Sequence, residues 1–211
     1  MDKDKPRSPI SAITLADYQQ TADAFREGTR DHDVSQNIAA LLRHITAPAP
    51  FTILDFGCGP GRDLITFKAL GHNPIGLDGC AEFVSMARAE TQSDVWLQDF
   101  LQLELPNEYF DGVFANASLF HVPSQFLPET LRQLRNTLKP NGVLFSSIPH
   151  GSDVEGWNGQ RYGVYHRPGS WQTFVREAGF EELEHYFRPA GLPRAQQPWF
   201  ASVWRRVNQY S

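Results

Sequence analysis

A strand that runs directly into a glycine-rich turn and then into a helix constrains this fold more than any other sequence feature. The segment Phe51–Phe56 is mostly apolar, and Gly57-Cys-Gly-Pro-Gly61 and a helical pattern follow it. Glycines permit a sharp turn and a close approach of ligand to backbone, and the free N–H groups at the start of a helix attract an anion or polar head group. The dinucleotide fingerprint is G-x-G-x-x-G, but Arg62 stands at its third glycine position. Taken alone, the glycine pattern also fits a simple tight turn, and its spacing disfavours NAD as a ligand; the residues that follow the next strands decide for a ligand site.

The strand–helix unit repeats along the chain. Strands are predicted at Phe51–Phe56, Asn73–Leu77, Val95–Gln98, Phe110–Ala115 and Val143–Ile148, and helices at 62–70, Ala81–Glu90 and Pro123–Leu138. This alternation indicates a parallel sheet covered by helices on both faces. A helix at Ser170–Ala178 precedes two final strands, Phe180–Phe187 and Trp199–Val207, which have no helix between them and should pair antiparallel. The predicted fold class is α/β, a doubly wound and mostly parallel sheet.

Two segments flank this core. Before it, Ile10–Arg30 predicts one helix, and Asp33 predicts the cap of a second, with an apolar face that includes Val34, Ile38 and Leu41. After it, Pro149–Arg167 is rich in Gly, Trp, Tyr and His, and we interpret it as a loop over a ligand site. We expect one domain, 1–211, with lid helices at 1–46, a cofactor-binding core at 51–148, a substrate loop at 149–167 and a C-terminal helix and strand pair at 168–211.

Composition excludes several classes of protein. The chain has 19 Lys and Arg against 24 Asp and Glu, a net charge of -5, whereas a nucleic-acid binder usually has a basic face. We find neither eighteen consecutive apolar residues nor a signal-like amino terminus. Cys58 and Cys80 are too few for a zinc cluster and fit a reducing cytoplasm. We expect a cytoplasmic protein with a small-molecule substrate and with no nucleic-acid, membrane or metal partner; the oligomeric state is open.

Acidic residues follow the next two predicted strands. Asp78 stands 21 residues after Gly57, close to the offset at which dinucleotide folds place the acid that binds the ribose hydroxyls. Asp99 follows the third strand, where it can accept from an exocyclic amine while Phe100 lies against a purine; alternatively, Asp99 is a helix cap. Polar groups at three successive strand ends predict a nucleoside site.

These residues resemble the class I S-adenosylmethionine-dependent methyltransferases. The resemblance rests on Ile53-Leu-Asp-Phe-Gly-Cys-Gly-Pro-Gly61, Gly76-Leu-Asp78, Gln98-Asp-Phe100, Phe110-Asp-Gly-Val-Phe-Ala-Asn116 and Leu138-Lys-Pro-Asn-Gly-Val-Leu144, in this order. It implies a Rossmann-like sheet of seven strands with the last antiparallel, S-adenosylmethionine as methyl donor, and no obligatory metal. It specifies the superfamily well and the substrate poorly.

The resemblance also implies residues for the donor. Gly57, Gly59, Asp78, Gly79, Asp99 and Phe100 should line it, and Asn116 and Ala117 should lie beneath its methionine end. For its carboxylate, Arg62 is a candidate, although a surface salt bridge is an equal alternative for that side chain. Arg30 and His32, at a polar helix junction with Tyr18 nearby, are candidates for the donor carboxylate or the substrate; the alternative is a capped turn.

Two groups are candidates for the acceptor side. His121, just after the fourth strand, can act as a general base, in which case the rate should rise with pH near 6 to 7; alternatively it only orients the backbone. The aromatic group Trp157, Tyr162, Tyr165 and His166 can enclose an aromatic ring or a cation, or can simply pack on itself.

The interpretation as a small-molecule methyltransferase has three rivals. One is an RNA or protein methyltransferase, which the lack of a basic face disfavours. The second is a nicotinamide-dependent oxidoreductase, which Arg62 disfavours. The third is a module that binds S-adenosylmethionine without catalysis, since no catalytic residue is obligatory. The acceptor atom, O, N or S, is left open.

Overall fold

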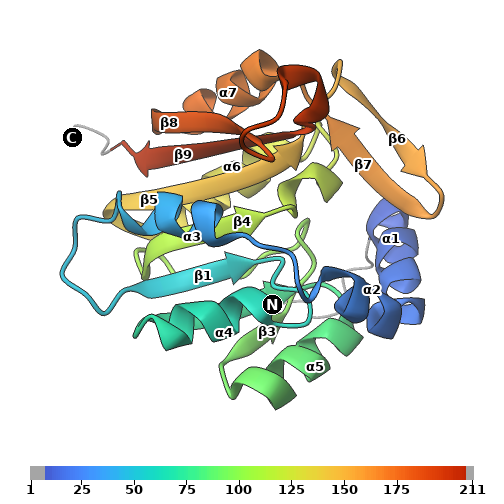
Figure 1. Ribbon diagram of the computed structural model, residues 1–211, viewed down its shortest axis with the longest axis horizontal. Helices are drawn as coiled ribbons and strands as arrows, with labels where there is room; N and C mark the ends of the chain where they lie inside the picture. Colours follow the sequence, from blue (N-terminus) through green and yellow to red (C-terminus); the bar gives the residue numbers. More distant parts are fainter. Residues whose placement is uncertain (1–7, 208–211) are drawn as a thin grey trace.

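Seven strands form the central sheet of the computed structural model, which describes residues 8–207 (Figure 1). Their order is β3-β2-β1-β4-β5-β9-β8. The strands are β1 (Thr52–Phe56), β2 (Asn73–Asp78), β3 (Val95–Leu97), β4 (Phe110–Asn116), β5 (Leu138–Pro149), β8 (Phe180–Arg188) and β9 (Trp199–Arg206). The first five pair in parallel, and β9 runs antiparallel to β5 and β8. The predicted fold class and its antiparallel last strand are confirmed.

Helices cover both faces of the sheet. They are α1 (Pro9–Gln20), α2 (Ala22–Thr29), α3 (Ser35–Leu42), α4 (Arg62–Ala69), α5 (Ala81–Thr91), α6 (Leu127–Thr137) and α7 (Pro168–Glu177), with 3-10 turns η1 (Leu119–His121) and η2 (Arg194–Gln196). Alternate residues of β1 point to opposite faces, so Ile53 packs in the cluster of α3 and α4, and Leu54 in that of α6 and α7. The sheet is therefore buried between two apolar layers.

The helix expected over Ile10–Arg30 is two helices. The chain leaves the helical conformation at Thr21 (φ -108°, ψ 12°), which separates α1 from α2. Two other boundaries differ: α6 begins at Leu127 rather than Pro123, and β5 already pairs with β4 at Leu138. Asp33 precedes the cap residue of α3, but its Oδ1 accepts the N–H of Ser35 at 2.9 Å. The expectation for the extreme amino terminus concerns residues outside 8–207.

The segment predicted as a substrate loop is instead a β-hairpin. Strands β6 (Val154–Asn158) and β7 (Arg161–Tyr165) form a separate two-stranded sheet, joined by a two-residue turn that begins at Gly159 (φ 62°). Glycine is favoured at this position of a tight hairpin because it adopts a positive φ without steric cost. Strand β7 packs against α1 and η1, so the hairpin lies beside the N-terminal helices (Figure 1).

The glycine turn after β1 requires its first glycine. Gly57 has φ 82°, and a Cβ added there would lie 2.4 Å from the Cβ of Ser118. Gly71 has a similar φ of 84°, but a Cβ there would meet nothing within 4 Å. A substitution at Gly71 therefore introduces backbone strain alone, whereas one at Gly57 introduces backbone strain and steric overlap.

We expect Gly71→Ala to lower the free energy of unfolding by about 1 kcal/mol, through backbone strain alone. Gly57→Ala should cost roughly 2–4 kcal/mol, because Ser118 and the segment after β4 must also move. Urea unfolding of both variants measures the difference. Equal losses would show that the overlap at Gly57 is relieved without cost.

Candidate functional site

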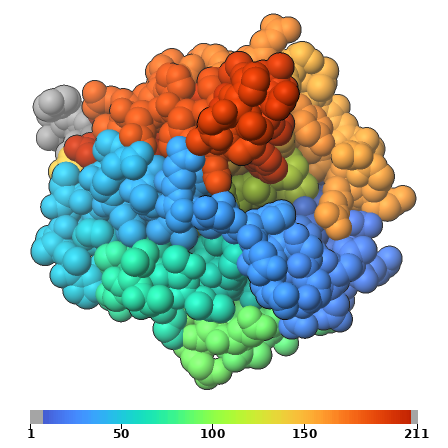
Figure 2. Space-filling view, in the orientation of Figure 1, coloured from blue at the N-terminus to red at the C-terminus, as the bar shows by residue number. Residues whose placement is uncertain are grey.

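A cavity of about 630 Å³ lies at the edge of the sheet where the parallel strands end. Gly57 after β1, Asp78 at the end of β2 and Asn116 at the end of β4 line it, together with residues of α1, α2 and the β8–β9 connection. In Figure 2, a recess between the blue N-terminal segment and the red C-terminal segment exposes yellow-green atoms from the middle of the chain. The volume suits a small ligand of drug-like size.

The glycine turn and Asp78 form one hydrogen-bonded unit. The N–H groups of Gly57 and Cys58 donate to the carbonyl of Leu77, at 2.8 and 3.1 Å. The Asp78 carboxylate accepts the N–H of Gly59 at 2.9 Å and that of Cys80 at 2.9 Å. Burial raises the pKa of Asp78 to about 6, against the lowering effect of these backbone donors. Asp78 thus joins the ends of β1 and β2 and also faces the cavity.

Asp99 leaves one oxygen without a partner in the cavity wall. Its Oδ1 accepts the Ser11 hydroxyl at 2.7 Å and the N–H of Leu101 at 2.9 Å. Its Oδ2 is buried and has no hydrogen-bond partner among the described residues. The ring of Phe100 stacks on Phe56 at a centroid distance of 4.3 Å and also lines the cavity. A buried carboxylate oxygen requires a donor, so this position fits an amine of a planar ligand.

A chain of side-chain hydrogen bonds connects the end of β4 to β8, the strand at the edge of the sheet. Asn37 donates to Oδ1 of Asn116 at 2.9 Å, and the Tyr186 hydroxyl donates to Oδ1 of Asn37 at 2.9 Å. Ala117, which follows Asn116 and also lines the cavity, has φ 59°, a left-handed conformation that is uncommon for a non-glycine residue. These contacts hold the middle of the cavity wall in one conformation.

The two arginines proposed for a donor carboxylate are placed differently. Arg62 lines the cavity, but its guanidinium binds Asp63 at 2.7 Å and donates to the Thr29 carbonyl at 2.9 Å. Arg30 is exposed beside Glu27 and Asp31 and does not line the cavity. At the same junction His32 does line it, as does Tyr18 on α1.

His121 is held by the two segments that flank the core. Its Nδ1 lies 2.6 Å from the Tyr162 carbonyl oxygen, which can only accept, so Nδ1 carries the proton. Its Nε2, 2.8 Å from the Tyr18 hydroxyl, therefore accepts that O–H. Burial lowers the pKa of His121 to about 4. The ring is consequently neutral at pH 7, with its one lone pair already bound to Tyr18.

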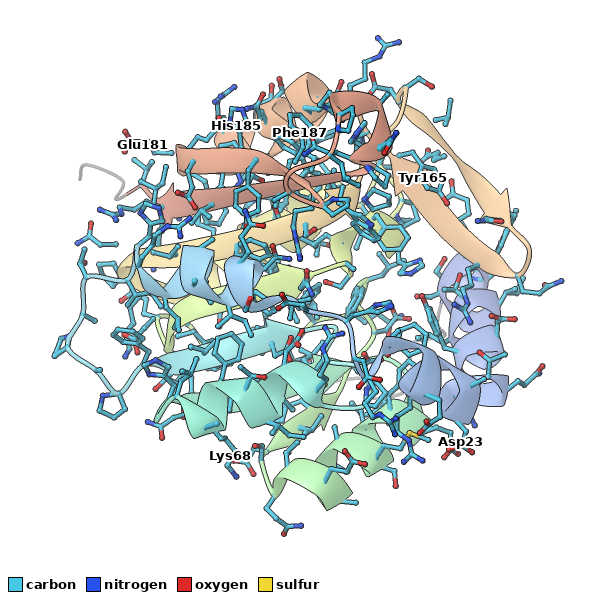
Figure 3. The ribbon with its side chains drawn as sticks, viewed as in Figure 1. Asp23, Lys68, Tyr165, Glu181, His185 and Phe187 are labelled. Atoms are coloured by element: carbon cyan, nitrogen blue, oxygen red, sulfur yellow. The ribbon has the colours of Figure 1, made fainter. Side chains whose placement is uncertain are left out.

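The aromatic residues of the hairpin do not line the cavity. Trp157 is exposed and its ring contacts that of Tyr162 at 5.4 Å, while Tyr165 lies on the hairpin (Figure 3). His166 is buried beside Phe174, with ring centroids 5.1 Å apart. The hairpin instead reaches the site through its backbone, at the Tyr162 carbonyl that His121 contacts.

Sequence reasoning missed part of the cavity wall. Ser11, Phe25, Arg188 and Trp199 all line it. Arg188 and Trp199 are paired in register where β8 ends and β9 begins, at the same edge as the ends of the parallel strands. Topology could have found these two, because an antiparallel strand begins where its parallel neighbour ends. Ser11 and Phe25 carry no comparable signal.

Residues 8–207 contain neither a membrane-spanning helix nor a group of side chains suited to a metal ion. No helix in this range is long and apolar enough to cross a membrane. Nor do three or more His, Cys, Asp or Glu side chains in the range gather where they could hold a metal ion.

Curated proteins similar to this chain include two methyltransferases. Trans-aconitate 2-methyltransferase of Azoarcus sp. (strain BH72) is 32% identical over 158 residues, 73% of this chain and 56% of that protein. Malonyl-[acyl-carrier protein] O-methyltransferase of Erwinia pyrifoliae is 31% identical over 141 residues, 64% of this chain and 53% of that protein. The chain thus spans little more than half the length of these relatives.

Solved structures share the fold across nearly the whole chain. The Burkholderia thailandensis 1,6-didemethyltoxoflavin-N1-methyltransferase, solved with 1,6-didemethyltoxoflavin and S-adenosylhomocysteine, has a TM-score of 0.78 at 20% identity, covering 97% of this chain and 93% of that one. The [4+2]-cyclase SpnF has a TM-score of 0.73 at 15% identity, covering 97% and 98%. One fold therefore serves different chemistry in these proteins.

Family assignment comes from the sequence itself. The family model described as a methyltransferase domain matches residues 25–196, from α2 through the β8–β9 connection. This range contains the glycine turn, both acids and His121. The chain therefore belongs to the methyltransferase-domain family.

Proposed function

We propose that this protein transfers the methyl group of S-adenosylmethionine to a small-molecule acceptor. The observation that carries the proposal is the cavity at the sheet edge, where the glycine turn, Asp78 and the unpartnered Oδ2 of Asp99 face one space. Methyltransferase relatives and a structural neighbour solved with S-adenosylhomocysteine support it. The cavity volume of about 630 Å³ favours a small acceptor over a macromolecule.

The cavity wall has a suitable group for each part of the donor. Asp78 accepts the ribose hydroxyls, and Asp99 accepts the exocyclic amine of an adenine that packs on Phe100. The methionine end lies along the end of β4. When bound, the donor supplies an electrophilic methyl on a sulfonium. The residues assigned to it are Gly57, Gly59, Arg62, Asp78, Gly79, Asp99, Phe100, Asn116 and Ala117. Tyr18 lines the same cavity, and we assign it to proton transfer instead.

We assign His121 a role that acts through Tyr18. An acceptor that loses a proton can give it to the Tyr18 oxygen, while the Tyr18 hydroxyl proton moves to Nε2 of His121. The O–H···N distance of 2.8 Å supports this transfer. Burial raises the pKa of Tyr18 to about 12, and the Arg161 guanidinium, 4.0 Å above the Tyr18 ring, offsets part of that rise. Positioning of donor and acceptor supplies the larger part of the rate acceleration.

A reducing compartment, and so the cytoplasm, stays part of the proposal. Cys58 and Cys80 are both free thiols, and both are buried. Burial raises the pKa of each thiol, which keeps it protonated and unreactive at neutral pH.

Asp78→Ala should weaken binding of S-adenosylhomocysteine by about tenfold or more, because the ribose loses its acceptor and Gly59 loses its partner. Calorimetry measures the affinity, with Glu82→Ala, an exposed substitution on α5, as the control.

Wild-type protein should bind S-adenosylhomocysteine and not NAD, and should label a component of a cell extract from methyl-labelled donor. Tighter binding of NAD, or undiminished affinity in folded Asp78→Ala, would contradict the assignment.

Tyr18→Phe and His121→Ala should each lower turnover by roughly a hundredfold with little change in donor affinity, since both break one proton path. Tyr109→Phe, at an exposed tyrosine beside Phe110, is the matched control. Because the pKa of His121 is about 4, its titration should add no rise in rate between pH 6 and 8, contrary to the sequence expectation. Normal turnover in Tyr18→Phe would rule out the path.

The buried neutral ring should also make stability depend on pH. His121 has a pKa of about 4 in the folded protein and about 6.5 unfolded, so the unfolded chain takes up the proton first as pH falls. Its contribution is complete above pH 6.5 and is lost between pH 6.5 and 4, by about 3 kcal/mol. Asp78, with its raised pKa, acts in the opposite direction, so the comparison must be with His121→Gln, which retains Asp78. Urea unfolding between pH 6.5 and 4 should show the difference in free energy of unfolding between wild type and His121→Gln becoming smaller as the pH falls. A difference that does not change with pH would show that the imidazole is exposed to water.

A further inference from the structure

At the end of the cavity opposite the two acids, Arg188 forms no ion pair with a carboxylate among the described residues. Arg188 closes β8, and its neighbour in register, Trp199, opens β9; both line the cavity. One N–H of Arg188 Nη2 donates to the Asp33 carbonyl at 2.7 Å. Nε is buried and has no hydrogen-bond partner among the described residues. The guanidinium is thus fixed in place with a donor unused.

The other arginine of the cavity wall is already paired. Arg62 is paired with Asp63 at 2.7 Å. The Asp33 side chain is exposed and accepts the N–H of Ser35 at 2.9 Å. That hydrogen bond lowers the pKa of the Asp33 carboxyl, and the charge of Arg188 adds a smaller lowering, but no ion pair within 4.0 Å joins the two side chains among residues 8–207. A buried arginine N–H without an acceptor costs free energy, and a planar oxyanion relieves that cost.

The order of the strands places Arg188 on the acceptor side. Asp99 and Asp78 follow β3 and β2, and the proposed methionine end lies at β4. Strand β8 is three places beyond β4, roughly 14 Å at 4.8 Å per strand. A donor that runs from β3 to β4 therefore ends short of Arg188. Phe187, labelled in Figure 3, packs on Phe200 at 5.3 Å and fixes the end of β8.

We propose that Arg188 is the specificity-determining residue for the acceptor, and that the acceptor is a small organic molecule with a carboxylate. The carboxylate is the group bound by Arg188, and the body of the molecule lies between Trp199 and the methyl donor. This inference rests on the proposed function, because it assigns the remaining end of the same cavity.

The test measures binding, with the protein saturated in S-adenosylhomocysteine. Two carboxylates, benzoate and succinate, and their amides, benzamide and succinamide, serve as probes in saturation-transfer NMR. Wild type should bind the carboxylates about tenfold more tightly than the amides. Arg188→Gln should lose this preference, and Arg188→Lys should retain part of it. Arg132→Gln, which removes an exposed arginine of α6 paired with Glu129, should leave it unchanged.

Two controls make each outcome decisive. Calorimetry with S-adenosylhomocysteine should give equal affinities for wild type, Arg188→Gln and Arg132→Gln, and thermal melting confirms that each variant folds. Failure of the wild type to bind S-adenosylhomocysteine would contradict the proposed function, whereas normal binding with no preference for carboxylates would overturn only the assignment of Arg188. A preference that survives in Arg188→Gln would also overturn it.

Discussion

Parallel pairing of β1 with β2 and β4 determines where the polar groups at the ends of these strands lie. Parallel strands end at one edge, so Gly57, Asp78 and Asn116 converge although the sequence separates them by tens of residues. The antiparallel strand β9 extends this edge, because it begins where β5 ends. Trp199 pairs with Pro149 on one side and with Arg188 on the other. A single row of strand ends therefore carries both the proposed nucleoside half and the proposed acceptor half of the cavity.

Binding groups at this edge are also structural groups. The two backbone N–H groups that Asp78 accepts are what hold the glycine turn against the end of β2. Burial raises the pKa of this carboxyl to about 6, and the backbone donors lower it, so the two effects oppose each other. Asn37 has a comparable double role, because it joins β4 to β8 through Asn116 and Tyr186. Mutations in this site therefore need a stability measurement beside each activity measurement.

The sequence predicted the sheet well and the flanking segments less well, for a physical reason. Strands such as Phe110–Ala115 are buried on both faces, so an apolar run between turn residues identifies them. The hairpin after Pro149 is a polar two-stranded ribbon that has little burial to set a period, and composition alone suggested a loop. Arg188 was missed because its role depends on a neighbour, Trp199, eleven residues away and on the backbone of Asp33.

Contacts with residues distant in the sequence also explain why the pKa and tautomer of His121 could not be predicted from its place in the sequence. A histidine after the fourth strand has an ordinary pKa unless something covers it. Here α1 contributes Tyr18 and the hairpin contributes the Tyr162 carbonyl, and together they bury the ring and fix its tautomer. Arg161 of the hairpin in turn binds Asp17 of α1 at 2.6 Å. The two segments outside the sheet thus hold each other and the histidine at once, so an opening of either one would return the imidazole to water and to its ordinary pKa.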